Sequence, residues 1–372
     1  MKPALTISAR KESAGIALII VMIAVLVLSA LAALLSYSMK VEGRLAVNAD
    51  SERQLVWLGR SGVELARWVL AQQAMIPNEP YDSLNQIWAG GQGTIAESNS
   101  PLVGIPLDNY PVGNGWVSVK IVDFERYANI NTANDQFLHQ SLTLMGVDAD
   151  QISIVSDSIL DWLTPGDQPR IAGAKSDYYQ GLNPPYQCKS APIDDMSELL
   201  LVRGIWDHTE IYWGGAAQNH PGPTFQHHLG FGNAGEAPNY PFGLKDLFMP
   251  FSSGRININT ADRNVLQMLL MTSGLDQDSA GTTADDIIKY RSGPGGANGT
   301  EEGNPFINPN QQLAAAGIPP AAVAQIGRFI DVRSHTFKVT VTANFGGISR
   351  KYNAILFRSG NGVQVVGFYL DQ

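Results

Sequence analysis

The residues able to carry out chemistry are few, and they are not grouped in the sequence. Cys188 is the only cysteine. His227 and His228 are adjacent, so their side chains would point different ways in an extended chain, and no cysteine or regularly spaced partner completes a zinc-ligand pattern. The sequence contains no nucleophile elbow, phosphate-binding loop or metalloprotease motif. We therefore expect no catalysis, and we interpret these histidines and His220 as part of a surface loop at 214–254.

Composition indicates a folded protein without covalent cross-links. The chain has 372 residues, of which 44% are hydrophobic and 16% charged, enough for a packed body of two modest domains. A single cysteine excludes an intrachain disulfide, so stability must come from core burial or a bound ion. The formal net charge of −9 argues against nucleic acid as the main partner.

The element that positions the rest is an uncharged apolar segment at 16–35. It reads IALIIVMIAVLVLSALAALL, which is about the length of a helix that crosses a bilayer. Lys2, Arg10 and Lys11 precede it and favour a cytoplasmic N-terminus, so the remainder of the chain would lie beyond the membrane. No small-residue cleavage site follows the segment, so any cut should fall before it.

Residues 36–73 continue this segment with a helical pattern. They contain no proline, and their charged residues fall largely between the apolar positions. Pro77 and Pro80 end the pattern. The predicted apolar face contains Leu55, Leu58, Leu65 and Val69. We interpret 16–75 as one helix, and two helices separated near Gly43 are the alternative.

An internal repeat organises the middle of the chain. The sequence NINTAN at 129–134 returns as NINTAD at 257–262, an offset of 257 − 129 = 128 residues. Each copy leads into a helical pattern and ends in a further short helix, at 196–202 and at 311–316. The expected N-terminal caps are Asn131 or Thr132 in the first copy and Asn259 or Thr260 in the second. The expected C-terminal caps are Gly146 and Gly274.

The N-terminal segment resembles the class III leader of type IV pilins and type II secretion pseudopilins. In that family a prepilin peptidase cuts after a glycine and the new N-terminus is methylated, and the match here is Gly15 followed by Ile16. Most members carry a glutamate at the fifth mature position, where this chain has Ile20. A carboxylate inside the membrane is costly unless paired, and its natural partner is the N-terminal amine of a neighbouring subunit. Absence of this glutamate is typical of the K-class minor pseudopilin.

The order of elements extends this resemblance over nearly the whole chain, to the general secretion pathway protein K family. It is also carried by the paired NINTA sequences, by SEL at 197–199 running to VRG at 202–204, and by alternating β patterns near the C-terminus. The implied fold class is α+β: a long transmembrane and amphipathic helix, a pilin-like antiparallel sheet, and a large inserted α-helical domain of the SAM or helix-hairpin-helix type. The expected boundaries are a leader at 1–15, the helix at 16–75, a loop and first β segment at 76–128, the inserted domain at 129–333 and β hairpins at 334–372.

The resemblance also implies a function and partners. It predicts a minor pseudopilin at the tip of the type II secretion pseudopilus, which starts assembly and caps the filament that drives folded proteins across the outer membrane. The implied partners are minor pseudopilins of the I and J classes and the prepilin peptidase. The chain would cross the bacterial inner membrane once, with its C-terminal domain in the periplasm. We expect partners to dock on the helix face formed by Leu55, Leu58 and Leu65.

Members of this family can bind Ca²⁺ in a loop of the inserted domain. The matching segment here is 161–178, in which Asp161, Asp167 and Asp177 are the expected ligands, since Ca²⁺ is bound by oxygen atoms, several from carboxylates. Lys175 stands where a glutamate is usual, and TPG at 164–166 replaces a more acidic sequence. A solvated loop without metal is the alternative.

Two alternative functions are a type IV pilus minor pilin and a helix-hairpin-helix protein that binds DNA during uptake. Helix-hairpin-helix modules bind phosphate through backbone N–H groups of a Gly-x-Gly hairpin at a helix N-terminus. The two hairpins here read GVD at 146–148 and GLD at 274–276. Asp148 and Asp276 would repel phosphate, so we expect these helices to be structural.

We predict that the mature protein begins at Ile16, because Gly15 separates the basic leader from the apolar segment. N-terminal sequencing or mass spectrometry of the membrane form should find this terminus, and Gly15→Ala should be processed poorly. Retention of the leader, or a cut after Ala33, would contradict the prediction.

Overall fold

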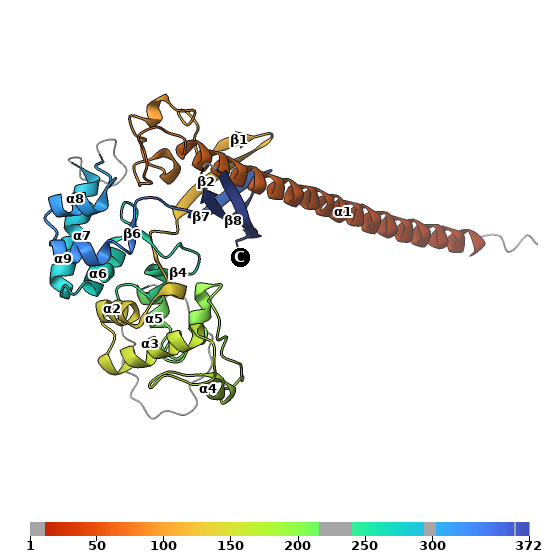
Figure 1. Ribbon diagram of the computed structural model, residues 1–372. Helices are drawn as coiled ribbons and strands as arrows, with labels where there is room; N and C mark the ends of the chain where they lie inside the picture. Colours follow the sequence, from red (N-terminus) through yellow and green to blue (C-terminus); the bar gives the residue numbers. More distant parts are fainter. Residues whose placement is uncertain (1–11, 216–239, 294–302, 361, 372) are drawn as a thin grey trace, which may run out of the picture.

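The computed structural model describes residues 12–215, 240–293, 303–360 and 362–371. One helix, α1 (Glu12–Gln73), projects from a globular body, and its C-terminal part packs on that body (Figure 1). The helix passes through Gly43 without a break, so the alternative of two separate helices is excluded. The body has two apolar cores, one between α1 and a sheet and the other within the inserted domain.

The sheet has five antiparallel strands in the order β1-β2-β7-β8-β9. The strands are β1 (Tyr110–Val112), β2 (Gly115–Asp123), β7 (Thr336–Phe345), β8 (Ile348–Ser359) and β9 (Gly362–Leu370). Burial alternates along β2 and β7 because one face of the sheet is covered and the other is not. In the centre, Val119 of β2 lies opposite Val341 of β7. Thus two strands far apart in the sequence are neighbours in the sheet.

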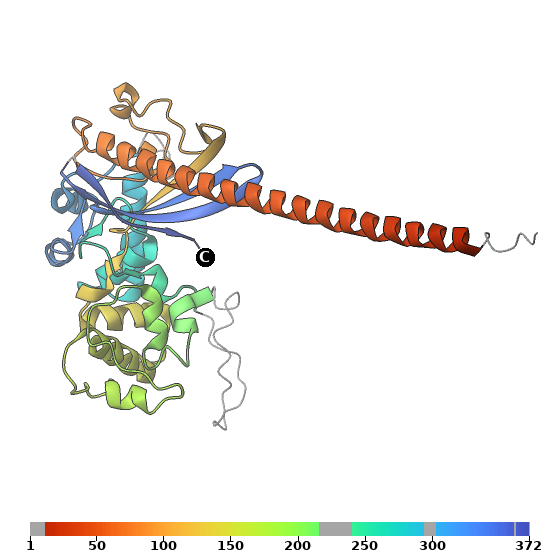
Figure 2. The ribbon, with the colours of Figure 1, turned by 90° about the vertical axis from the view of Figure 1, so that its right-hand side faces the viewer.

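Helix α1 lies across the covered face of the sheet (Figure 2). Two glycines allow this close approach. A Cβ atom at Gly59 would lie 2.5 Å from the ring of Tyr352, and one at Gly62 would lie 2.4 Å from Cγ1 of Val341. Both distances are shorter than van der Waals contact, so only glycine fits at these two positions.

The segment between α1 and the sheet contains two 3₁₀ helices, η1 (Ile87–Ala89) and η2 (Glu97–Asn99). The buried carboxylate of Glu97 accepts the backbone N–H groups of Ile87 at 3.0 Å and Thr94 at 2.6 Å. Burial raises the pKa of Glu97 to about 7, although these hydrogen bonds act to lower it. In the core between α1 and the sheet, the ring of Trp88 packs edge-on against that of Phe337, with ring centroids 5.4 Å apart.

The inserted domain consists of two successive helical halves, which form the lobes coloured yellow-green and cyan-blue in Figure 1. The first half contains β3 (Ala128–Asn129), η3 (Ile130–Thr132), α2 (Asp135–Met145), α3 (Ala149–Leu163), α4 (Ser176–Gln180), η4 (Met196–Leu201), α5 (Glu210–Trp213), η6 (Leu244–Asp246) and β4 (Phe248–Met249). The second half contains β5 (Ile256–Asn257), α6 (Arg263–Thr272), α7 (Gln277–Ser292), α8 (Pro309–Ala315), α9 (Pro320–Ile326) and β6 (Ile330–Asp331).

The structure confirms the internal repeat. The first residues of α2 and α6 differ by 263 − 135 = 128, and those of α3 and α7 by 277 − 149 = 128. Each half begins and ends with strands that pair in parallel, β3 with β4 and β5 with β6. Gly146 is the C-cap of α2 as expected, with a left-handed φ of 86°, whereas the C-cap of α6 is Ser273 and Gly274, with a φ of 92°, follows it. The expected short helices are η4 and α8.

The repeated asparagines have a different role from the one we expected. Asn131 and Asn259 lie before the helices rather than at their N-caps, which are Asn134 and Asp262. The Asn131 side chain exchanges two hydrogen bonds with the backbone of Ile193, at 2.7 and 3.0 Å. Asn259 does the same with Phe306, at 2.7 and 2.9 Å. Thr132 and Thr260 also lie before the helices, so the cap assignments were wrong. In each half the asparagine amide fixes a later segment against the start of the repeat.

The close packing of α1 leads to a prediction about Gly62. Gly62→Val should destabilise the chain by about 1–3 kcal/mol, because the added methyl groups overpack the contact with Val341. Gly43→Val is the matched control, since a Cβ atom there has no neighbour within 4 Å. Urea unfolding of the full chain in detergent measures both, and equal midpoints for the two variants would contradict the prediction.

Candidate functional site

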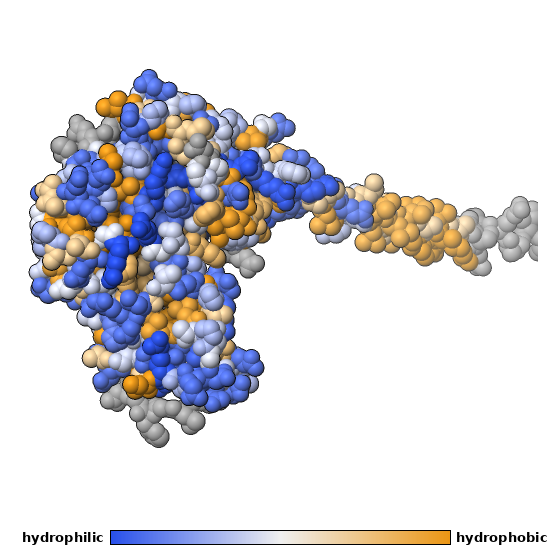
Figure 3. All heavy atoms as spheres, in the orientation of Figure 1, coloured by the Kyte–Doolittle hydropathy of each residue, from blue (hydrophilic) through white to orange (hydrophobic). Residues whose placement is uncertain are grey.

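The N-terminal half of α1 is an exposed apolar rod. The helix is long and apolar enough to cross a membrane, and none of its apolar stretch is buried against the body. The hydrophobic atoms form the orange segment that extends from the body in Figure 3. Gly15, Ile16 and Ile20 lie in the first turns of α1, and they are all exposed. The assignment of Gly15 and Ile16 to a processing site stays a prediction.

The structure corrects the assignment of the leucine face to partner docking. Leu55 is fully buried and Leu58 is 6% exposed, because both pack in the core between α1 and the chain's own sheet. Leu65 is partly buried against the same core. The helical spacing correctly indicated an apolar face, but this face is already covered within the chain.

The face of α1 that remains available contains Trp57, with 64% of its surface exposed. The guanidinium of Arg60 lies between two rings, 5.5 Å from the centroid of Trp57 and 5.7 Å from that of Phe368 on β9. Beside Trp57 runs a groove of about 480 Å³ between α1 and the β1–β2 turn, and its walls include Gln54, Ser61 and Phe345. In the sequence, this surface is indicated only by Trp57, which lies outside the helical spacing of the leucine face.

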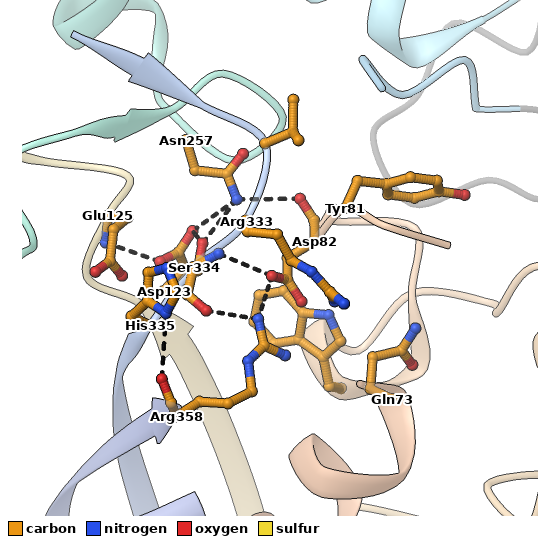
Figure 4. A network of polar contacts seen from close by, with 12 residues as sticks. Gln73, Tyr81, Asp82, Asp123, Glu125, Asn257, Arg333, Ser334, His335 and Arg358 are labelled. Atoms are coloured by element: carbon orange, nitrogen blue, oxygen red, sulfur yellow. Dashed lines mark hydrogen bonds and ion pairs between the residues drawn. The ribbon is translucent and has the colours of Figure 1, made fainter. Parts of the chain in front are cut away.

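A buried polar network joins the sheet to the inserted domain (Figure 4). Asn257 of β5 donates from Nδ2 to the Asp82 carbonyl at 3.1 Å, to the Asp123 carboxylate at 3.3 Å and to the Ser334 hydroxyl at 2.7 Å. The Ser334 hydroxyl donates to Asp123 at 2.6 Å. Arg358 of β8 forms an ion pair with Asp82, and both side chains are nearly or fully buried. Sequence reasoning identified Asn257 only as part of the repeat.

This junction contains three buried carboxylates, those of Asp82, Asp123 and Glu125, whereas its one paired guanidinium is that of Arg358. Burial and the neighbouring Asp82 raise the pKa of Asp123, although Ser334 and Thr260 donate hydrogen bonds to it. Burial, followed by the charge of Asp123, raises the pKa of Glu125 to about 8. Glu125 accepts backbone N–H groups from Ser253 at 3.2 Å and Thr336 at 3.0 Å. Protonation of these acids therefore favours the folded junction.

One of the expected calcium ligands, Asp161, is buried in the last turn of α3, before the loop. The carboxylate of Asp161 accepts the backbone N–H of Arg170 at 3.0 Å, and burial raises its pKa. The ammonium of Lys175 is also buried and donates to the backbone carbonyls of Asp161 at 2.5 Å and Thr164 at 2.6 Å. The ammonium of Lys175 thus binds backbone carbonyls at the end of α3, and the carboxylate of Asp161 binds a backbone N–H group of the loop.

The other expected ligands do not join Asp161. Asp167 and Asp177 are exposed, and the described residues contain no group of three acidic, histidine or cysteine side chains placed to bind a metal ion. His220, His227 and His228 lie outside the described residues.

The hairpin aspartates differ in their contacts. Asp276 caps α7 and accepts the N–H groups of Asp278 at 3.1 Å and Ser279 at 3.0 Å. These hydrogen bonds lower its pKa. Asp148 is the N-cap residue of α3, but its side chain makes no capping hydrogen bond. At α7 the donors that would bind a phosphate are thus already paired within the chain.

Comparison with known proteins identifies related sequences. A family model described as type II secretion system (T2SS), protein K, matches residues 119–209. A putative type II secretion system protein K from Escherichia coli K12 is 27% identical over 202 residues, covering 53% of this chain and 59% of that protein. A type II secretion system protein K from Klebsiella pneumoniae is 25% identical over 206 residues, covering 51% and 58%. The chain thus spans about three fifths of the curated relatives it matches.

Comparison of the folds extends the similarity. A chain in the crystal structure of the GspK-GspI-GspJ complex from the enterotoxigenic Escherichia coli type 2 secretion system matches with a TM-score of 0.59 at 18% identity. The match covers 87% of this chain and 98% of that chain. The predicted resemblance to the K class of minor pseudopilins and the α+β fold are therefore confirmed.

The acidic junction predicts a dependence of stability on pH. The pKa of Glu125 is about 8 in the folded chain against 4.5 for an ordinary glutamate, so the folded state binds more protons between these values. The free energy of unfolding should therefore fall as pH rises from 5 to 8. Glu125→Gln should reduce this slope, whereas exposed Glu64→Gln should not. Urea midpoints at the two pH values measure the slope, and equal slopes in the wild type and Glu125→Gln would contradict the assignment.

Proposed function

We propose, from its similarity to type II secretion system protein K in sequence and fold, that this chain is the K-class minor pseudopilin at the tip of a type II secretion pseudopilus. The observation that carries the proposal is the continuity of α1. A single helix runs from an exposed apolar segment to a face that packs on an antiparallel sheet. Such a helix joins a membrane anchor to a folded body without a flexible linker.

The exposed apolar segment supports an inner-membrane location. Residues 16–35 suit the hydrocarbon core of a bilayer, and the basic residues before them favour a cytoplasmic N-terminus. The body would then lie in the periplasm. Removal of the leader by prepilin peptidase after Gly15 would leave the apolar segment at the N-terminus of the mature protein.

The proposed partners are minor pseudopilins of the I and J classes, since the solved complex with the same fold is named for GspK, GspI and GspJ. The surface best suited to them is Trp57 with the adjoining groove. A large exposed aromatic side chain beside a groove is a common anchor of protein interfaces. Its position on α1 would bring a partner's helix alongside the membrane helix.

Two features support a place at the filament tip. Ile20 provides no carboxylate for a neighbour's N-terminal amine, so one contact between subunits in the membrane is missing. The inserted domain extends sideways from the axis of α1 (Figures 1 and 2), where it would collide with the next subunit in a tightly wound shaft. A tip subunit could start assembly and cap the filament that exports folded proteins.

The alternative of DNA binding is disfavoured by Asp276, whose carboxylate occupies the N-terminus of α7. A phosphate would meet that negative charge in place of free N–H groups. As a structural component of a secretion filament, the chain needs no catalytic activity, and we propose none.

The test is co-purification of the full chain with the I-class and J-class subunits of the same system. Trp57→Ala should reduce capture of the partners by about tenfold, the effect of losing a typical interface anchor. Trp206→Ala is the matched control, because Trp206 is an exposed tryptophan of the inserted domain rather than of α1.

Failure of the wild-type chain to capture either subunit would contradict the proposed partners. Equal capture by the two tryptophan variants would contradict the proposed surface. Antibody labelling of assembled filaments should mark their ends, and labelling along the shaft would exclude the tip position.

A further inference from the structure

Lys175 is buried, with 4% of its surface exposed. Its ammonium group has three hydrogens and three acceptors: the Asp161 carbonyl at 2.5 Å, the Thr164 carbonyl at 2.6 Å and the Ser190 hydroxyl at 3.3 Å. Asp161 lies in the last turn of α3, and Thr164 is its C-cap. Carbonyl groups at a helix C-terminus are unpaired within the helix and carry partial negative charge, so a cation is favourable there.

Carboxylates of the same helix also bind the loop, and here the helix side chains accept hydrogen bonds from the loop backbone. Asp157 accepts the N–H of Ala172 at 3.0 Å, and Asp161, one turn later, accepts the N–H of Arg170 at 3.0 Å. Gly173 closes over this pair, since a Cβ atom there would lie 2.0 Å from Oδ2 of Asp161. Helix and loop thus exchange charge-assisted hydrogen bonds in both directions.

The donor set does not fit a calcium ion. Ca²⁺ takes six to eight oxygen ligands, several of them carboxylate oxygens, whereas the Lys175 ammonium is surrounded by two carbonyls and one hydroxyl. The cations around the loop are Lys175, Arg170, which is 3.8 Å from Asp161, and Arg203, which donates to the Gly173 carbonyl at 3.0 Å. The carboxylates of Asp157 and Asp161 already accept backbone N–H groups of the loop, and Asp167 within the loop is exposed.

We propose that the ammonium of Lys175 is a built-in cation that closes the loop at 164–175 onto the C-terminus of α3, so that this loop folds without calcium. A bound metal ion would link the loop's structure to the ion concentration, because binding stabilises only the folded form. A covalently attached ammonium group is present at any ion concentration. This inference does not depend on the proposed function or on the partners of α1.

The experiment compares the full chain in detergent with Lys175→Met, which keeps the length of the side chain and removes its charge. Lys351→Met, at an exposed position of β8, is the control. Thermal melting and trypsin cleavage after Arg170 are measured in EDTA and in millimolar CaCl₂. Arg170 is followed by fully exposed Ile171, so cleavage there reports opening of this loop even where the rest of the chain stays folded.

The wild type should give the same melting temperature and the same cleavage rate in EDTA and in CaCl₂. Lys175→Met should melt several degrees lower and be cleaved after Arg170 at least tenfold faster, and calcium should restore neither property. Lys351→Met should behave as the wild type. Loss of wild-type stability in EDTA, or a Lys175→Met variant with an unchanged cleavage rate, would overturn the proposal.

Discussion

The antiparallel pairing of β2 with β7 is the contact on which the rest of the structure depends. It joins residues 116–123 to residues 337–344, so the ends of the whole inserted domain leave the sheet side by side. Closing so long a loop costs conformational entropy, and the buried junction around Asp123 and Asn257 adds contacts where both ends meet. The same pairing completes the apolar face that α1 covers. Without it, neither α1 nor the inserted domain would have a fixed place.

The packing of α1 divides the surface of that helix between three environments. Gly59 and Gly62 bring the helix close enough to the sheet for its leucine face to be fully covered. The apolar N-terminal half has no covering within the described chain, which suits a bilayer. The remaining side, with Trp57 and its groove, is the part of the helix beside the body that is still available to another protein. This division of the α1 surface arises because the close approach to the sheet covers only the leucine face of the helix.

The sequence was sufficient to predict the elements that repeat or alternate. The 128-residue offset located both helical units, and alternation located the strands of the sheet, because these patterns record which side of an element is buried. The same patterns cannot show what covers an apolar face, so Leu55 and Leu58 were assigned to a partner although the chain's own sheet covers them. Nor does the spacing of aspartates show the direction of a carboxylate. Asp161 points into the loop, whereas Asp167 and Asp177 are exposed.

The two halves of the inserted domain also differ in which residues place positive charge near the C-terminus of an equivalent helix. Helices α3 and α7 occupy equivalent positions, and the last carbonyl groups of each have no partner within the helix. The last turn of α7 contains Lys289 and Arg291, whereas that of α3 contains no basic residue. In the first half the positive charge instead comes from Lys175, which reaches back across the loop to the helix end. Because Lys175 lies at the far end of the loop, its hydrogen bonds to the helix end also fix the chain between them.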